Sequence, residues 1–323
     1  MNVTMAVCAY SLARWEQMVA AVGSVLDQLR GADDCVLVID HNDELLGLAA
    51  DRFRDEPRLR IVPNRGPAGV SGARNAAVGH ARGDIVAFLD DDAVAEPGWL
   101  DDVRAALAEP AVVAIGTAAV PMWESGSRPS WFPREYDWVV GCTYLGLPTG
   151  AAEVRNVNGA AMAFRREIFG AVGGFSAMVG RRGAAYTGCE ETELCIRIRQ
   201  SRPGARIVYL PNVAVRHNVP RERMRIRYFL RRCYGEGLSK ARVAQLVGSD
   251  DGLASERSYV RSTLPRGVAR ELRRGLGGRP AGWLAAALIV VGLMVTATGY
   301  TLGRLRGYAV TPVPGEVAAV ADR

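Results

Sequence analysis

Three adjacent carboxylates, Asp90, Asp91 and Asp92, follow directly after the apolar run 85–89. Neighbouring carboxylates repel one another unless a cation or hydrogen-bond donors neutralise them. Oxygen ligands of this kind suit Mg²⁺ or Mn²⁺, which proteins usually share with substrate phosphates. The sequence therefore predicts a divalent-metal site here. The alternative is a solvated acidic turn that caps the next helix.

A second acidic cluster lies at the start of a helix expected over 189–199. Glu191 shares the apolar face of that helix, so we expect its side chain to point inward. Glu190 and Glu193 are expected toward the flank, where Glu193 can pair with Arg197. An inward carboxylate at the mouth of a site could act as a general base. The alternative is a set of ordinary charges favoured by the helix dipole.

Alternating strands and helices are expected to position these acids. Four short apolar strands, at 3–9, 35–40, 59–62 and 85–89, alternate with helical patterns and short connections. This order predicts an α/β fold with a doubly wound, mainly parallel sheet flanked by helices. Ligands of such sheets bind beyond the carboxyl ends of the strands. Asp40 ends the second strand, so we expect it to face the same crevice as the three aspartates.

The expected crevice suits a nucleotide diphosphate. Asp40 could accept a hydrogen bond from a base or a ribose hydroxyl, and Arg74 could meet a phosphate. The glycine-rich loop 64–75 would allow close approach of the ligand. That loop is neither the dinucleotide fingerprint nor a P-loop, so an ordinary turn remains the alternative.

The next part of the chain adds a helix at 98–108, a strand at 112–120 and a long loop at 122–156 that is rich in aromatic residues. The rings could stack on a sugar or close as a lid, or they could anchor the loop by their own burial. Asn158 and Gly159 precede a strand at 160–165, and their backbone could approach a donor sugar.

The segment 281–303 has no charged residue and lies between Arg279 and Arg304. A helix of this length reaches roughly 35 Å, enough to cross a bilayer, and Trp283 and Tyr300 would lie at interface depth. A buried core helix is the alternative. More arginines precede the segment than follow it, so a single-pass protein of the cytoplasmic membrane is expected, with its large N-terminal part in the cytoplasm.

The chain has 323 residues and a formal net charge of +6. Its arginine-rich stretch after residue 220 mixes apolar and basic residues, which favours an amphipathic helix on anionic lipid over nucleic-acid binding. The six cysteines form no metal-type pair and suggest a reducing compartment. The chain begins directly with a strand pattern, so no signal peptide is expected. Four regions are predicted: a catalytic domain at 1–220, a basic helical region at 221–280, a transmembrane helix at 281–303 and a short tail at 304–323.

An ordered set of motifs resembles glycosyltransferase family 2, which has the GT-A fold. The set comprises V-C-A-Y, V-I-D, N-R-G, S-G-A-R-N-A-A, G-D-I-V-A-F-L-D-D-D-A, N-G-A-A-M-A-F-R-R-E, G-G-F and C-E-E-T-E-L-C-I-R. The whole pattern also resembles enzymes of lipid-linked oligosaccharides such as the glucosyl-dolichyl phosphate glucuronosyltransferases. The resemblance covers roughly the first 220 residues.

The resemblance implies roles for individual residues. Asp92 would hold the metal on the donor diphosphate, with His217 as a further ligand, and Asp90 or Asp91 would lie near the ribose. Asp40 would recognise the base. Its pocket would be lined by Ala9 and Tyr10.

Glu191 would withdraw the proton of an acceptor hydroxyl as it attacks the anomeric carbon, in a single displacement that inverts the configuration. Relatives usually have Glu-Asp where this chain has Glu190-Glu191, so either residue is a candidate base.

These expectations combine into a metal-dependent inverting glycosyltransferase. The Q-x-x-R-W element of processive relatives is absent from the sequence, so transfer of a single sugar is predicted. The donor is expected to be UDP-linked and the acceptor to be a lipid-linked or other glycan at the membrane. A sugar nucleotidyltransferase is one alternative, although it would carry a glycine-rich signature where this chain has A-Y-S-L-A-R-W. A catalytically idle membrane scaffold is the other.

Overall fold

The computed structural model describes residues 1–180, 187–248 and 254–306. Most of the predicted tail, residues 307–323, lies outside this part of the chain. The strands are β1 (Val3–Ala9), β2 (Asp34–Ile39), β3 (Leu59–Pro63), β4 (Ile85–Asp90), β5 (Ala93–Ala95), β6 (Val112–Trp123), β7 (Ala152–Glu153), β8 (Ala161–Arg165) and β9 (Arg206–Val219). The longer helices are α1 (Trp15–Leu26), α2 (Asp43–Arg52), α3 (Val70–His80), α4 (Trp99–Ala106), α5 (Glu167–Val172), α6 (Glu190–Ser201), α7 (Ile226–Val247), α10 (Leu264–Leu276) and α11 (Ala281–Leu305). Short helical pieces are η1 (Leu12–Arg14), η2 (Arg134–Val140), η3 (Arg221–Met224), α9 (Ala254–Ser258) and η4 (Tyr259–Thr263).

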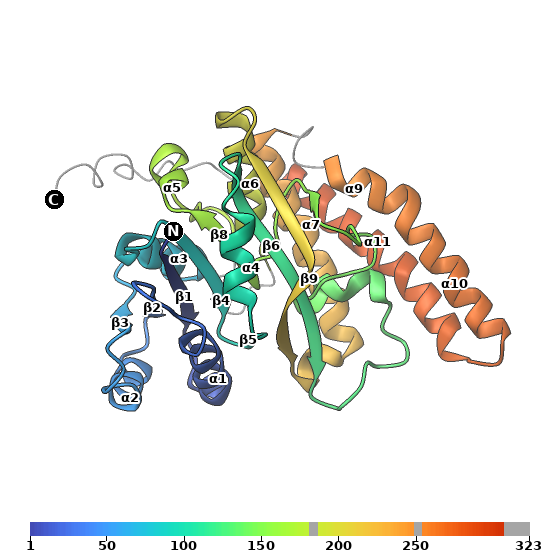
Figure 1. Ribbon diagram of the computed structural model, residues 1–323. Coiled ribbons are helices and arrows are strands. Elements are labelled where there is room, and N and C mark those ends of the chain that lie inside the picture. The colour runs from blue at the N-terminus through green and yellow to red at the C-terminus, as the bar shows by residue number, and fades with distance from the viewer. Residues whose placement is uncertain (181–186, 249–253, 307–323) are drawn as a thin grey trace.

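The strands of the described residues form one mixed sheet in the order β3-β2-β1-β4-β8-β6-β9-β5, with β7 paired to β9 (Figure 1). The first four strands are parallel, as the alternating pattern predicts. Beyond β4 the sheet departs from the parallel arrangement, because β8 pairs antiparallel with both β4 and β6. The α/β class with flanking helices is therefore confirmed, and the sheet is mixed.

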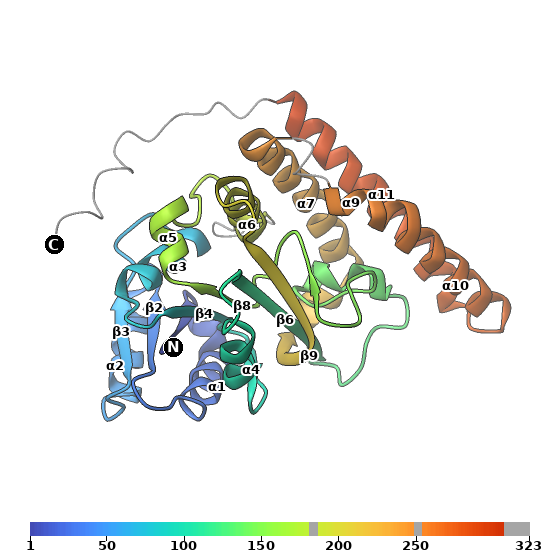
Figure 2. The same ribbon diagram turned by 45° about the horizontal axis from the view of Figure 1, so that its top comes forward.

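Alternate residues of the central strands enter two separate cores. Val3, Met5 and Val7 of β1 face one core, which α1, α2 and α4 cover, while Ala6 faces the other. The second core lies under α3, α5 and α6, and Figure 2 shows the sheet between these two helix layers. Burial on both faces explains why the strands are continuous apolar runs.

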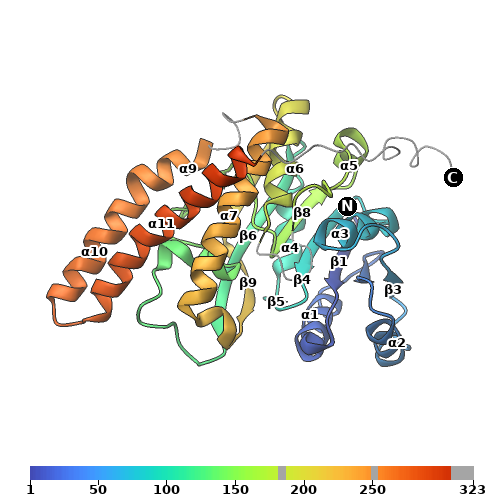
Figure 3. The same cartoon turned by 180° about the vertical axis from the view of Figure 1, so that it is seen from behind.

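A third core joins the aromatic loop to the C-terminal helices. Phe132 and Tyr136 pack with Phe229 of α7 and with Leu288 and Ile289 of α11. Burial of these rings anchors the loop, and stacking of other rings of the loop on a sugar stays a prediction. Figure 3 shows α7, α10 and α11 side by side next to the sheet.

Strand β9 begins at Arg206 and continues to Val219. Pro211 and Asn212 interrupt the apolar pattern in this stretch. The pairing of β6 with β9 shifts register at the same place, between Leu210 and Ala214. The irregularity hides the continuity of the strand from the sequence, and β9 brings His217 beside the acidic loop.

Candidate active site

A cavity of about 770 Å³ opens at the carboxyl ends of β1, β2 and β4. All the residues predicted for the site line it: Ala9, Tyr10, Asp40, Arg74, Asp90, Asp91, Asp92, Asn158, Gly159, Glu190, Glu191 and His217. Elements far apart in the sequence thus meet at one place. The cavity extends well beyond these residues, as far as α11.

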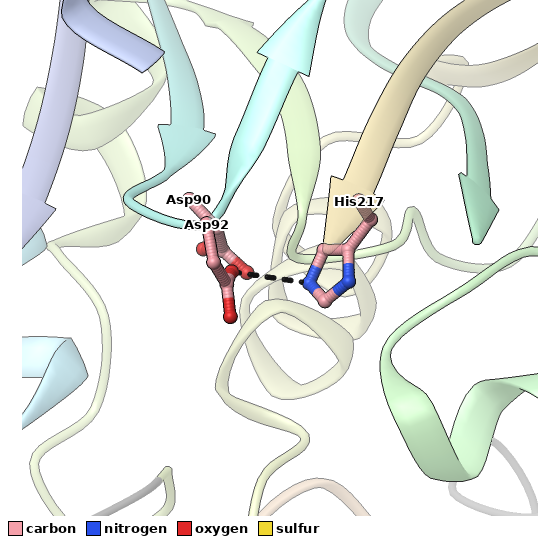
Figure 4. Close-up of side chains that lie close together, drawn as sticks. All are labelled: Asp90, Asp92 and His217. Atoms are coloured by element: carbon pink, nitrogen blue, oxygen red, sulfur yellow. Dashed lines mark ion pairs between the residues drawn. The ribbon is translucent and has the colours of Figure 1, made fainter. Parts of the chain in front are cut away.

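Asp90, Asp92 and His217 form a compact group of possible metal ligands, shown in Figure 4. One ligand atom from each lies within 4.8 Å of the others. His217 is held there because it pairs across the sheet with Ala93, the residue after Asp92. Its Nε2 lies 3.2 Å from Asp92 Oδ1. Two carboxylates and an imidazole fit a divalent cation such as Mn²⁺ or Mg²⁺.

Two arginines that the sequence-based prediction missed neutralise the acidic loop. Arg14 Nη1 donates to Asp91 Oδ1 at 2.6 Å and lies 3.3 Å from Asp92 Oδ2. Arg223 Nη2 donates to Asp92 Oδ2 at 3.1 Å. The need of three adjacent carboxylates for cationic partners was the available signal. The sequence could not say which arginines would supply them, and Arg223 belongs to the stretch that was expected at the lipid surface.

The two buried aspartates differ in their ionisation. Burial raises the pKa of Asp91 to about 7, against the effect of Arg14. Burial also acts to raise the pKa of Asp92, but His217, Arg223 and Arg14 outweigh it and hold that pKa below its usual range. The pKa of His217 lies well above its ordinary value: burial lowers it, and the Asp92 carboxylate more than compensates. Asp92 is therefore a permanent carboxylate in a cationic setting.

Glu190 was expected on the flank of α6. In the structure its side chain is buried in the wall of the cavity. Its Oε1 accepts from Arg74 Nη1 at 2.7 Å. Arg74 Nη2 also donates to Asp90 Oδ1 at 3.1 Å and to the carbonyl oxygen of Gly159 at 2.9 Å. The expectation was wrong because helical spacing gives only the direction of a side chain relative to its own helix. It cannot show that the buried Arg74 of α3 lies opposite Glu190. Arg74 thus connects the two acidic clusters.

Glu191 is half-buried and lines the cavity beside its buried neighbour. Burial and the Glu190 carboxylate raise the pKa of Glu191 to about 8, against the effect of Arg74. A carboxylate with such a pKa is a stronger base than an ordinary glutamate, which suits proton transfer near neutral pH. Glu193 pairs with Arg197 at 2.7 Å, as the spacing predicts.

Asp40 fixes the glycine loop. It accepts from Asn64 Nδ2 at 2.6 Å through Oδ1 and from the Gly69 amide at 2.9 Å through Oδ2. Ala9 is buried at the end of β1, and the adjacent Tyr10 is exposed and lies under the Arg14 guanidinium. Recognition of a base by Asp40 and Tyr10 remains a prediction.

Asn158 orients the turn before β8. Its Nδ2 donates to the carbonyl oxygen of Gly141 at 3.2 Å, and its Oδ1 accepts from the Ala160 amide at 3.0 Å. These contacts hold the Asn158-Gly159 backbone at the cavity, where a donor sugar was predicted to lie.

A further charged network lines the far side of the cavity. Lys240 of α7 lies 2.5 Å from Glu256 and 3.2 Å from Glu236, and Arg155 makes two hydrogen bonds to Glu256. Beyond this network the wall is formed by α11, through Thr296, Ala297 and Tyr300 among others. No motif marked these residues, because their neighbourhood depends on how the C-terminal helices pack.

The model of the family described as glycosyl transferase family 2 matches residues 5–173. The chain belongs to glycosyltransferase family 2. A relative from Haloferax volcanii, named glucosyl-dolichyl phosphate glucuronosyltransferase, is 35% identical over 255 residues, which cover 78% of this chain and 80% of the relative. The predicted family and the predicted glycosyltransferase activity are both confirmed.

Solved structures confirm the GT-A fold of this family 2 protein. The mannosyltransferase PcManGT from Pyrobaculum calidifontis, in complex with GDP-Man and Mn²⁺, superimposes with a TM-score of 0.58 at 18% identity, covering 91% of this chain and 86% of the other. S. aureus TarS 1–349 in complex with UDP gives a TM-score of 0.50 at 14% identity, covering 94% and 92%. Within the described part of this family 2 chain, one helix, α11, is long and apolar enough to cross a membrane.

Proposed function

We propose that this protein is a metal-dependent inverting glycosyltransferase that moves one sugar from a nucleotide-diphosphate donor to a lipid-linked acceptor at the cytoplasmic face of the membrane. The observation that carries the proposal is the single cavity, which contains Asp92 and Glu191 and extends to the apolar helix α11. The donor chemistry and the lipid-facing helix therefore belong to one site.

Asp92, Asp90 and His217 would hold the divalent cation. The cation, when bound, would neutralise the diphosphate as it leaves. Arg14 and Arg223 lie against Asp92 and are placed to meet the donor phosphates once the carboxylate binds the metal. A solved relative of this fold contains Mn²⁺ with a nucleotide sugar, which supports Mn²⁺ or Mg²⁺ here. UDP is the nucleotide we favour, with Asp40, Tyr10 and Ala9 around its base.

Glu191 would accept the proton of the acceptor hydroxyl as that oxygen attacks the anomeric carbon. Its raised pKa suits this step, and Arg74 holds Glu190 away in an ion pair. The Gly159 carbonyl, fixed by the same arginine, would border the donor sugar. One displacement of the diphosphate by one oxygen inverts the configuration at the anomeric carbon.

The acceptor would approach from the α11 side. The Haloferax volcanii relative is named for a dolichyl phosphate substrate, and the apolar helix α11 at the cavity suits an acceptor that carries a lipid chain. The six cysteines are all free, as in a reducing compartment, which supports a catalytic part on the cytoplasmic side.

The test is to incubate detergent-solubilised protein and Mn²⁺ with a panel of nucleotide sugars, with and without a polyprenyl-phosphate sugar. Release of nucleoside diphosphate that needs the lipid acceptor is the expected result. Release of pyrophosphate from a sugar phosphate and a nucleoside triphosphate would identify a nucleotidyltransferase instead. Absence of turnover with every donor and acceptor would favour the alternative of a catalytically idle membrane scaffold.

A further inference from the structure

Helix α11 has two unlike faces. One face is buried against the protein and is rich in small residues: Gly282, Ala285, Ala286, Leu288, Ile289, Gly292, Gly299 and Gly303. The opposite face is apolar and exposed: Trp283, Leu284, Val290, Val291, Met294 and Leu305. From Trp283 to Met294 these exposed residues recur at helical spacing. A large continuous apolar face of this kind marks an interaction surface.

The buried face packs against charged helices over the full length of α11. Antiparallel α10 lies along its first half, since Gly267 lies near Ile289 and a Cβ on Gly282 would lie 2.6 Å from the Gly275 nitrogen. The Tyr136 hydroxyl donates to the carbonyl oxygen of Ile289 at 2.9 Å. Helix α7 accompanies the second half, where Gly237 and Gly299 cross so closely that a Cβ on Gly237 would lie 2.1 Å from the Thr296 carbonyl oxygen.

The neighbouring helices cannot follow α11 through hydrocarbon. Helix α10 carries a partly buried ion cluster in which Arg270 binds Glu135 and both Arg270 and Arg274 bind Glu271. Helix α7 carries the Lys240 network and the exposed side chain of Arg231. Charged residues at the centre of a bilayer are costly, and the cavity that α11 lines contains charged side chains such as Glu236 and Lys240. A vertical crossing would require α11 to leave its packed position.

We propose that α11 docks the protein on an anionic lipid surface from one side, with its exposed face in the membrane interface and both of its ends in the cytoplasm. Because protein covers the other face of α11, only this apolar face is available to lipid, as in a helix that lies in the membrane interface. Exposed arginines at both ends, Arg279 before the helix and Arg304 and Arg306 after it, match anionic headgroups. Trp283, which is 47% exposed, lies on the apolar face at interface depth. The sequence-based prediction of a single crossing would then be replaced by attachment to one leaflet.

The same geometry gives the acceptor a route, and this consequence rests on the proposed function. Thr296 and Tyr300 lie on the edge of α11 between its buried and exposed faces, and they line the cavity. A lipid with its chain in the leaflet could therefore pass its headgroup along this edge toward Glu191.

Cysteine accessibility in sealed inverted membrane vesicles tests the topology without any need for activity. Arg279→Cys and Arg306→Cys are each introduced into the full chain and treated with a membrane-impermeant maleimide. Both should label without detergent, to the same fraction of the labelling found after detergent. If Arg306→Cys labels only after detergent while Arg279→Cys labels before it, the helix crosses the bilayer and the proposal is wrong. The unsubstituted chain gives the background, because five of its cysteines are buried and Cys8 is partly so.

Flotation with phosphatidylglycerol vesicles tests the surface itself. Met294→Glu places a charge on the exposed face, where Met294 is 62% exposed, and should lower the floated fraction of purified protein about tenfold. Leu48→Glu is the matched control, because Leu48 is 45% exposed on α2, a helix that does not belong to the proposed lipid-binding surface. The Leu48→Glu variant should float like the unsubstituted protein. Equal flotation of the Met294→Glu variant and the unsubstituted protein would exclude this face as the lipid contact.

Discussion

Asp92 lies among three cationic groups, His217, Arg223 and Arg14, at 3.1–3.3 Å. Charges this close in a buried site keep the carboxylate ionised at any physiological pH. The same groups would compete with a metal for its oxygens unless the donor diphosphate draws the arginines away. Metal and donor binding are therefore expected to support each other.

Replacing Asp92 tests the metal site. Asp92→Asn keeps the shape of the side chain but removes the charge, so we expect turnover to fall by at least about 10² because charge on the leaving diphosphate is no longer balanced. Nucleoside diphosphate release gives the rate, and circular dichroism checks the fold. Full activity of this variant, or of the unsubstituted enzyme in excess chelator, would contradict the metal assignment.

Replacing Glu191 tests the general base. Glu191→Gln should bind donor and metal normally while transfer falls by about 10² or more, because no group remains to accept the proton. Donor titration by calorimetry separates binding from turnover. Glu190→Gln is the matched variant, and it should act through Arg74, whose contacts with Asp90 and Gly159 it loosens. A larger loss of turnover in Glu190→Gln would mean that Glu190 is the base.

The pH profile follows from the pKa of Glu191, which is about 8. A base works only when deprotonated, so kcat/KM should fall about tenfold per pH unit below that value and reach a plateau above it. Glu190→Gln removes one of the charges that raise this pKa, so its profile should move to lower pH. An unchanged midpoint in Glu191→Gln would assign the ionisation to another group, of which Asp91, with a pKa of about 7, is the first candidate.

Helices α7 and α11 meet at glycines, and the contact leaves no room for side chains. A Cβ on Gly299 would lie 2.3 Å from the Tyr234 carbonyl oxygen. Close approach of this kind is typical of helix pairs that associate through small residues. The contact fixes the wall of the cavity formed by Thr296 and Tyr300.

Gly299→Ala should therefore destabilise the protein by about 1–3 kcal/mol, the usual cost of overpacking. Thermal unfolding in detergent gives the change in stability. Gly47→Ala in α2 is the control, because a Cβ there meets no atom within 4 Å, and removing a glycine from a helix stabilises it by about 0.5–1 kcal/mol. Equal melting temperatures for the two variants would show that the helices do not pack as described.

The molecule as a whole is one catalytic unit in which α11 is a structural part and not only an anchor. Its Leu288 and Ile289 belong to the third core with Tyr136 and Phe229. Each such buried side chain contributes about 1.5–3 kcal/mol. The boundary predicted at residue 281 thus separates regions that share a core and a cavity.

Deletion of residues 281–323 should consequently abolish transfer to a water-soluble acceptor as well as to a lipid-linked one. The measurements are nucleoside diphosphate release with both acceptors and the unfolding temperature. A truncated chain that folds and retains full activity on the soluble acceptor would show that α11 serves as a tether.

The sequence alone predicted the family, its glycosyltransferase activity and the first half of the fold. Alternating apolar runs and helical patterns are local signals, so they predict β1 to β4 and their parallel order. The acidic residues after β4 predict a metal site because their mutual repulsion must be offset. Strand β8 is antiparallel to β4, and the pairing of β9 with β6 shifts register. Glu190 forms an ion pair with Arg74, and Arg14 and Arg223 form ion pairs with Asp92. Only the tertiary structure decided these outcomes, because each depends on which distant segment of the chain packs against the residue or strand concerned. Helix α11 is the clearest case. Its apolar length can be read from the sequence, but which face is buried and which is exposed follows from its packing on α7 and α10.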